Sequence, residues 1–198
     1  VNQAQRVAKR ARTLKKKHIK VKPVTTHEIK VNSVKNYGGK VILKGDTFDE
    51  AYDYALKLAK KEGYAFIHPY DDKDVIAGQG TIGKELLEQI DQGIDAIFIP
   101  VGGGGLLAGV GTYIKALSPK TKVIGVEPED AACLKLAIDN KKRLSLKEVG
   151  LFADGVAVKQ IGEKTFSLIK EWVDDVVTVT VDEMCAAVQD TFQETRTM

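Results

Sequence analysis

The sequence lacks three features that would mark a membrane, secreted or metal-binding protein. No apolar run approaches the roughly 20 residues that a membrane-spanning helix needs, and no apolar segment follows the basic N-terminus as in a secretory signal. Its two cysteines, Cys133 and Cys185, are far apart and lack the spacing of metal ligands, so we expect free, reduced thiols. We therefore expect a cytoplasmic protein with no membrane partner.

The strongly basic N-terminal segment contains no Phe, Trp or Tyr. Residues 1–22 carry nine basic side chains and no acidic one, and the first of these aromatic residues is Tyr37. A basic arm can bind nucleic acid by neutralising phosphates, but this arm offers no platform on which bases could stack. We interpret the charges as a solvated face and do not expect a nucleic-acid partner, although binding through this arm stays an alternative.

The apolar residues alternate between the period of helices and the period of strands. The expected helices are 2–14, 25 to about 38, 47 to about 62, 75–90, 106–117, 130–139, 162–172 and a last one from 182. The expected strands are 18–22, 41–43, 65–67, 96–101, 123–126 and 176–181. Helix starts are predicted from the pairs Thr25 with Glu28 and Thr47 with Glu50, and from Asp182.

Short connections between alternating strands and helices favour parallel sheets. We expect an α/β fold with two three-layer parallel-sheet units. Residues 1–68 form a small domain, and residues 69–198 form part of a larger domain that is incomplete in this chain. A parallel strand buried on both faces is normally apolar throughout, so we expect the face with His18, Lys20 and Lys22 to meet water.

Four consecutive glycines, Gly102, Gly103, Gly104 and Gly105, separate an apolar strand from a helix. Each glycine costs backbone entropy on folding, so the run needs a physical reason. Without Cβ atoms, the backbone can approach a ligand closely and several N–H groups can converge on one anion. The following helix adds the positive end of its dipole. We therefore expect a phosphate at the carboxyl end of this strand.

Two other phosphate-binding loops fit the glycines less well. The nucleoside-triphosphate loop ends in Gly-Lys-Ser/Thr, whereas Gly105 is followed here by Leu106 and Leu107. The dinucleotide fingerprint G-x-G-x-x-G is approximated only loosely, although an acidic residue, Glu127, follows at a suitable distance. From the loop alone a dinucleotide site stays open, as does a glycine-rich turn that merely packs tightly.

Five short sequence segments together give more information about the protein family than the four glycines alone. They are His-Pro-Tyr-Asp-Asp at 68–72, Val-Ile-Ala-Gly-Gln-Gly-Thr at 75–81, Val-Gly-Gly-Gly-Gly-Leu-Leu-Ala-Gly-Val at 101–110, Val-Ile-Gly-Val-Glu-Pro at 123–128 and Phe-Ala-Asp-Gly-Val-Ala-Val at 152–158. They resemble signatures of the threonine dehydratases, pyridoxal-phosphate enzymes of the tryptophan-synthase-β-like group with the type II fold. The resemblance is close over residues 23–198 and looser over 1–22.

The resemblance implies a lyase of isoleucine biosynthesis that removes water from L-threonine or L-serine and releases ammonia and a 2-oxo acid. The cofactor pyridoxal 5'-phosphate would serve as electron sink, while the protein orients it. The resemblance also implies that the parent enzyme is a homo-oligomer, either a dimer or a tetramer. By resemblance, backbone N–H groups bind the cofactor phosphate at Gly102, Gly103, Gly104, Gly105 and Leu106, Asn2 bonds the ring's phenolic oxygen, and Gly155 lies near ring and substrate. A helix cap is the alternative role of Asn2.

Two segments of the family are not found in the 198 residues. One is a Ser-x-Lys-x-Arg segment, whose lysine holds the cofactor covalently. The other is a Ser-Gly-Gly/Ala-Asn stretch, whose serine faces the pyridine nitrogen. We therefore expect a central fragment of such an enzyme and assign no catalytic residue within it. The alternative is an inert fragment or binding module that keeps only the phosphate loop.

Some relatives bind a divalent cation through a glutamate, a backbone carbonyl and an aspartate. Glu127 and Ala131 match the first two of these ligands, but Cys133 stands where the aspartate would be. A hard cation prefers oxygen at that position, so we predict no metal ion here.

Overall fold

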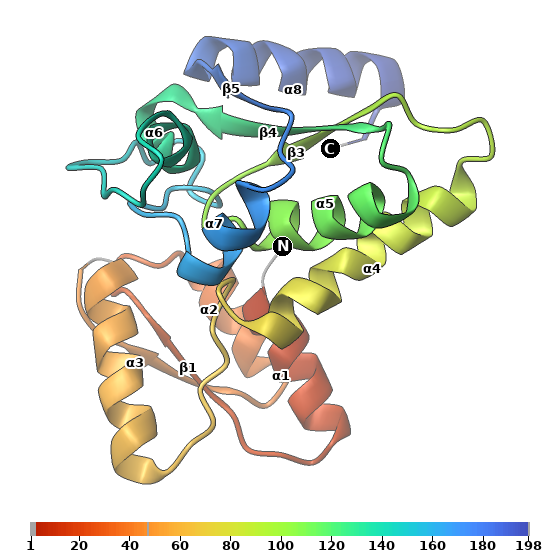
Figure 1. Ribbon diagram of the computed structural model, residues 1–198. Coiled ribbons are helices and arrows are strands. Elements are labelled where there is room, and N and C mark those ends of the chain that lie inside the picture. The colour runs from red at the N-terminus through yellow and green to blue at the C-terminus, as the bar shows by residue number, and fades with distance from the viewer. Residues whose placement is uncertain (1–2, 47, 198) are drawn as a thin grey trace. The chain divides into compact units, whose positions relative to one another are not determined.

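The computed structural model describes residues 3–46 and 48–197, and their side chains over 5–46 and 50–197. The chain divides into two compact units, Val1–Ile67 and His68–Met198, each built from helices and parallel strands (Figure 1). This arrangement confirms the α/β class with parallel sheets. No helix within the described residues is both long enough and apolar enough to cross a membrane.

The first unit is built around two parallel strands, β1 (Ile19–Lys22) and β2 (Lys40–Leu43). Its helices are α1 (Gln3–Thr13), α2 (Glu28–Lys35) and α3 (Phe48–Glu62). Its buried centre is small and consists of Ala8 and Val34, with Tyr37 and Val41 packed against them. Gly63 ends α3 in the left-handed conformation (φ +68°), which glycine adopts without strain.

Two expectations for the first unit are wrong. Residues 65–67 form no strand, because no neighbouring strand pairs with them among the described residues. The face that carries His18, Lys20 and Lys22 is half-buried rather than open to water. Lys20 lies beside Val41 in the parallel pair, and Val41 packs against Ala8 of α1 and Val34 of α2. Burial, and then the charge of Lys22, lower the pKa of Lys20 to about 8.

The helix starts of the first unit also differ from the predicted caps. The helix α2 begins at Glu28 after His27, which forms no side-chain cap. Instead of capping α2, the Thr25 hydroxyl donates to the Asp46 carbonyl at 3.4 Å. Thr47, the other predicted cap, lies outside the described residues.

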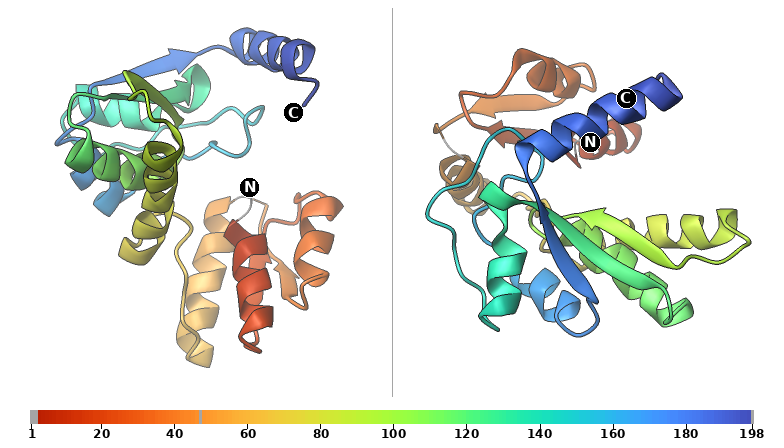
Figure 2. Two further views of the ribbon diagram at one scale, coloured as in Figure 1. Left: turned by 90° about the vertical axis from the view of Figure 1, so that its right-hand side faces the viewer. Right: turned by 90° about the horizontal axis from the view of Figure 1, so that it is seen from above.

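The second unit is built on a sheet of three parallel strands in the order β3-β4-β5. These strands are β3 (Ala96–Pro100), β4 (Lys122–Pro128) and β5 (Asp175–Val179). Its helices are α4 (Lys73–Gln89), α5 (Gly105–Leu117), the short 3-10 turn η1 (Glu129–Ala131), α6 (Cys133–Asp139), α7 (Glu163–Ile169) and α8 (Val181–Thr195). The helices α4 and α5 lie side by side on one face of the sheet, and α8 extends beyond the end of β5 (Figures 1 and 2).

The last helix starts from a different residue than predicted. Thr180, not Asp182, is the cap: its hydroxyl accepts the Glu183 N–H at 3.2 Å, and the Glu183 carboxylate accepts the Thr180 N–H at 2.7 Å. This reciprocal capping box places the start of α8 directly after β5.

Two glycines let α4 and α5 approach until their backbones touch. A Cβ built on Gly109 would overlap the Ile76 carbonyl oxygen, and one on Gly80 would lie 3.2 Å from the Gly109 carbonyl oxygen. The opposite side of α5 buries Leu107 and Ile114 in the core under the sheet. The helix α5 is therefore closely packed on two sides, by α4 and by the core under the sheet.

Candidate functional site

The glycine loop, residues 102–105, follows β3 at the edge of the sheet where all three parallel strands end. The Val101 N–H still belongs to the sheet and donates to the Val126 carbonyl at 2.9 Å. The loop then turns into α5 through Gly104, whose φ of +86° lies in the left-handed region. A side chain at this position would be strained. The structure thus places the predicted loop between strand and helix.

Close packing accounts for the absence of side chains in the loop. A Cβ on Gly103 would overlap the Tyr70 ring, and one on Gly105 would lie 3.0 Å from Tyr70 Cβ. A Cβ on Gly102 would lie 3.0 Å from Val156 Cα. The Tyr70 ring and the segment at Val156 therefore pack directly on the loop backbone.

The predicted residue Gly155 is adjacent in sequence to this contact. It is exposed, and no atom of the described residues comes within 4 Å of a Cβ built on it. Val156, the next residue, thus lies against the glycine loop. Asn2, the remaining predicted site residue, lies outside the described residues.

The first turn of α5 presents N–H groups without acceptors inside the helix. The first intrahelical bond runs from the Ala108 N–H to the Gly104 carbonyl at 2.8 Å, so the N–H groups of Gly105, Leu106 and Leu107 precede the ladder. They lie at the positive end of the helix dipole. A helix start of this kind, joined to a loop free of side chains, suits an anion such as a phosphate.

The residues matched to a cation site have another structural role. The Glu127 side chain is fully buried, and its two carboxylate oxygens accept the N–H groups of Leu134 and Lys135, each at 2.8 Å. Burial raises the pKa of Glu127, and the hydrogen bonds from Leu134 and Lys135 partly offset this shift. Glu127 therefore caps α6.

Cys133 is buried beside this carboxylate and is expected to be unreactive. Burial, and then the Glu127 charge, raise the pKa of its thiol to about 12, so almost no thiolate exists near neutral pH. We expect iodoacetamide at about pH 8 to leave Cys133 unmodified in the native protein and to alkylate it after unfolding. Peptide mapping by mass spectrometry measures this, with the exposed Cys185 as the reactive comparison. Rapid native labelling of Cys133 would contradict the buried site.

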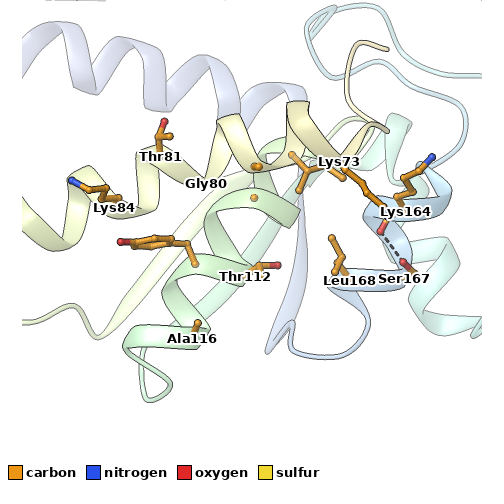
Figure 3. A pocket seen from close by; sticks show the side chains of 13 residues that line it. Lys73, Gly80, Thr81, Lys84, Thr112, Ala116, Lys164, Ser167 and Leu168 are labelled. Carbon is orange, nitrogen blue, oxygen red and sulfur yellow. Dashed lines mark hydrogen bonds between the residues drawn. The ribbon is translucent and has the colours of Figure 1, made fainter. Parts of the chain in front are cut away.

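A cavity of about 670 Å³ lies elsewhere in the second unit, among α4, α5 and α7 (Figure 3). Its walls are mainly apolar, with Ile76 and Leu168 among them, and the Ser167 hydroxyl at its edge donates to the Lys164 carbonyl. None of the residues 102–106 lines it. We do not assign the cofactor to this cavity, because the N–H groups at the start of α5 belong to the glycine loop, which does not line it.

Three residues that sequence reasoning missed surround the glycine loop. Tyr70 and Asp71 belong to the phrase at 68–72 but had no assigned role. The Tyr70 ring packs on Gly103, and the Asp71 carboxylate accepts N–H groups of α7. Thr165, on α7, donates its hydroxyl to the Gly103 carbonyl at 2.8 Å. No signal in the sequence marks Thr165, because its partners lie more than sixty positions away.

The chain is similar over its whole length to curated threonine dehydratases. It is 50% identical over 200 residues to the biosynthetic L-threonine dehydratase of Burkholderia multivorans, with 100% of this chain and 39% of that protein covered. It is 54% identical over 198 residues to the mitochondrial threonine dehydratase of Schizosaccharomyces pombe, with 100% and 33% covered. The chain therefore spans between about a third and two fifths of the length of these relatives.

Solved structures lead to the same group of proteins. The processed form of threonine deaminase isoform 2 from Solanum lycopersicum matches with a TM-score of 0.95 at 47% identity, covering 100% of this chain and 54% of that chain. The predicted type II fold is thereby confirmed. The family model described as "Pyridoxal-phosphate dependent enzyme" matches residues 2–198. The chain belongs to the family of pyridoxal-phosphate dependent enzymes.

Proposed function

We propose that this chain is the cofactor-binding part of an ammonia-lyase that converts L-threonine to a 2-oxo acid and ammonia. The observation that carries the proposal is the glycine loop at the start of α5, in a chain half identical to threonine dehydratases. The inert binding module is the less favoured alternative, because proteins named as threonine dehydratases match the chain over its full length.

The residues of the loop fit the phosphate of pyridoxal 5'-phosphate. We propose that backbone N–H groups of Gly102, Gly103, Gly104, Gly105 and Leu106 bind this phosphate. The free N–H groups at the start of α5 and the lack of Cβ atoms in the loop support this assignment. When bound, pyridoxal phosphate supplies an electron sink for the charge that develops at the substrate's α-carbon.

The remaining predicted site residues would act around the ring. We propose that Asn2 bonds the phenolic oxygen and that Gly155 lies beside ring and substrate. The contact of Val156 with Gly102 supports the second assignment, because it brings the 153–156 segment to the phosphate loop. We assign His68–Met198 to the large cofactor-binding domain and Val1–Ile67 to the small domain.

We also infer a homodimer or homotetramer and a cytoplasmic location for the complete enzyme. Both inferences rest on the resemblance to the family. The location depends on the source organism, because the relative from Schizosaccharomyces pombe is named as mitochondrial and a relative from Solanum lycopersicum as chloroplastic.

The assay that tests the function uses the full-length enzyme reconstituted with pyridoxal phosphate. We expect L-threonine to yield equal amounts of ammonia and 2-oxobutanoate, because water leaves from the β-carbon and hydrolysis then releases ammonia. Ammonia and 2-oxo acid are measured separately, with L-serine as the competing substrate. Gly78→Ala is a matched control expected to keep the activity, since a Cβ at this exposed position meets no atom within 4 Å. Cofactor binding without turnover of either amino acid would favour the inert module.

A further inference from the structure

We propose that Thr165 is a positioning residue that turns the N–H groups of the glycine loop toward the cofactor phosphate. This inference rests on the proposed function. The evidence is that the carbonyl oxygens of Gly102 and Gly103 both accept hydrogen bonds from side chains of the protein. Thr165 does not touch the phosphate in this account and acts through Gly103.

The Gly103 carbonyl is fixed by two donors near the start of α7. It accepts the Thr165 hydroxyl at 2.8 Å and the Gly162 N–H at 3.3 Å. In a planar trans peptide the C=O and the next N–H point in opposite directions. Holding the Gly103 carbonyl toward α7 therefore directs the Gly104 N–H away from α7.

The preceding peptide is held in the same sense by a weaker donor. The Gly102 carbonyl lies 3.5 Å from the Cys133 thiol, which it shares with the Glu127 carboxylate, so this contact directs the Gly103 N–H away from α6 only weakly. A thiol is a weak donor, whereas the Thr165 hydroxyl is a normal one. We therefore assign the larger share of the positioning to Thr165.

Asp71 holds α7 in place for this contact. Its carboxylate accepts the N–H groups of Glu163 at 3.0 Å, Lys164 at 2.8 Å and Thr165 at 3.1 Å. These are charge-assisted bonds to N–H groups that a helix start leaves free. Because the neighbouring Tyr70 packs on Gly103, positions 70 and 71 fix both the loop and the helix that orients it.

A matched pair of threonines allows the inference to be tested. Thr165 is 0% exposed and Thr121 is 1% exposed, and both hydroxyls donate to a backbone carbonyl, at 2.8 Å and 2.7 Å. Thr121 bonds Ile94, before β3, rather than the glycine loop. Thr165→Val and Thr121→Val each remove one buried hydroxyl with little change of shape, but only the first should affect the phosphate.

The measurements are the dissociation constants of pyridoxal phosphate and of inorganic phosphate from the full-length apoenzyme. Calorimetric titration gives both values, and thermal unfolding of the apoenzyme reports stability. We expect Thr165→Val to weaken both ligands about tenfold, because Gly162 still holds the carbonyl. Thr165→Ser, which keeps the hydroxyl, should bind within about twofold of the wild type. Thr121→Val should lower the melting temperature while leaving both dissociation constants unchanged.

Equal binding by the wild type and Thr165→Val would overturn the inference, as would equal weakening by both valine variants. If Thr165→Val fails to fold, Asp71→Asn decides the question, because loss of its charge should loosen α7 and weaken phosphate severalfold. Unchanged binding by that variant would likewise overturn the inference. A wild type that binds inorganic phosphate but not pyridoxal phosphate refutes the proposed function, and the phosphate titrations alone then decide the role of Thr165.

Discussion

Alanine at position 103 is expected to weaken pyridoxal-phosphate binding about 10- to 100-fold. The added methyl group would overlap the Tyr70 ring, which packs on the loop at this point. Overpacking of a buried site typically costs about 1–3 kcal/mol, and about 1.4 kcal/mol corresponds to a tenfold change in affinity. Either the ring or the loop must move, and movement of the loop displaces N–H groups from the phosphate. Titration of the full-length apoenzyme with pyridoxal phosphate measures the loss.

A double-mutant cycle with Tyr70→Ala separates steric overlap from other causes. Removing the ring opens the space that the methyl group needs, so Gly103→Ala should cost clearly less affinity in the Tyr70→Ala background. The same loss in both backgrounds would show that the ring does not explain the glycine at 103. Gly78→Ala serves as the control for glycine replacement in general, because it lies on the exposed side of α4.

The alternation of helices and strands was predictable because each buried element carries its own periodicity. The pattern around 96–101 and 106–117 led directly to β3 and α5, and the glycines between them marked the phosphate loop. The pattern gave a wrong prediction for a short apolar run, because such a run forms a strand only if a neighbouring strand pairs with it. Residues 65–67 read as a strand, yet a strand exists only when another pairs with it, and none does among the described residues.

Helix starts were predicted less accurately because several residues near a start can serve as the cap. Asp182 and Thr180 are both suitable cap residues, and only the reciprocal bond between Thr180 and Glu183 selects Thr180.

The predicted solvent exposure of β1 was wrong because it depends on residues distant in the sequence. A lysine-rich strand normally indicates a solvent-exposed face, but α1 and α2 cover the face that carries Lys20 and half-bury its lysines.

The glycine loop was found from local sequence, whereas the groups that support it were not. A run of four glycines is recognisable by itself, because its entropic cost indicates a bound anion, close packing of the loop backbone, or both. The Thr165 hydroxyl donates to a carbonyl 62 positions away, and the Asp71 carboxylate accepts N–H groups 92 to 94 positions away, so only folding brings these groups together. A threonine inside a helix and an aspartate in a turn are common residues, and neither indicates such a contact.

Alanine at position 109 is expected to destabilise the second unit by about 3 kcal/mol. A Cβ on Gly109 would overlap the Ile76 carbonyl oxygen and lie 2.7 Å from the Gly80 nitrogen. Both obstacles are backbone atoms of α4, which cannot rotate away as a side chain can, so the two helices must separate. With about 2–4 °C per kcal/mol for a folding unit of 150–250 residues, the melting temperature of the domain that contains α4 and α5 should fall by roughly 6–12 °C. Thermal and denaturant unfolding of the full-length apoenzyme measure the change.

Gly78→Ala is the matched control for this prediction, since Gly78 lies on α4 and a Cβ there meets no atom within 4 Å. Alanine in an open helical position is favoured over glycine, so this variant should be more stable by about 0.5–1 kcal/mol. The two substitutions add the same methyl group but should change stability in opposite directions. Because α5 also carries the glycine loop at its start, Gly109→Ala should further weaken phosphate binding. A Gly109→Ala protein as stable as Gly78→Ala would show that α4 and α5 can separate at no cost, and the close contact between them could not then be what holds the loop.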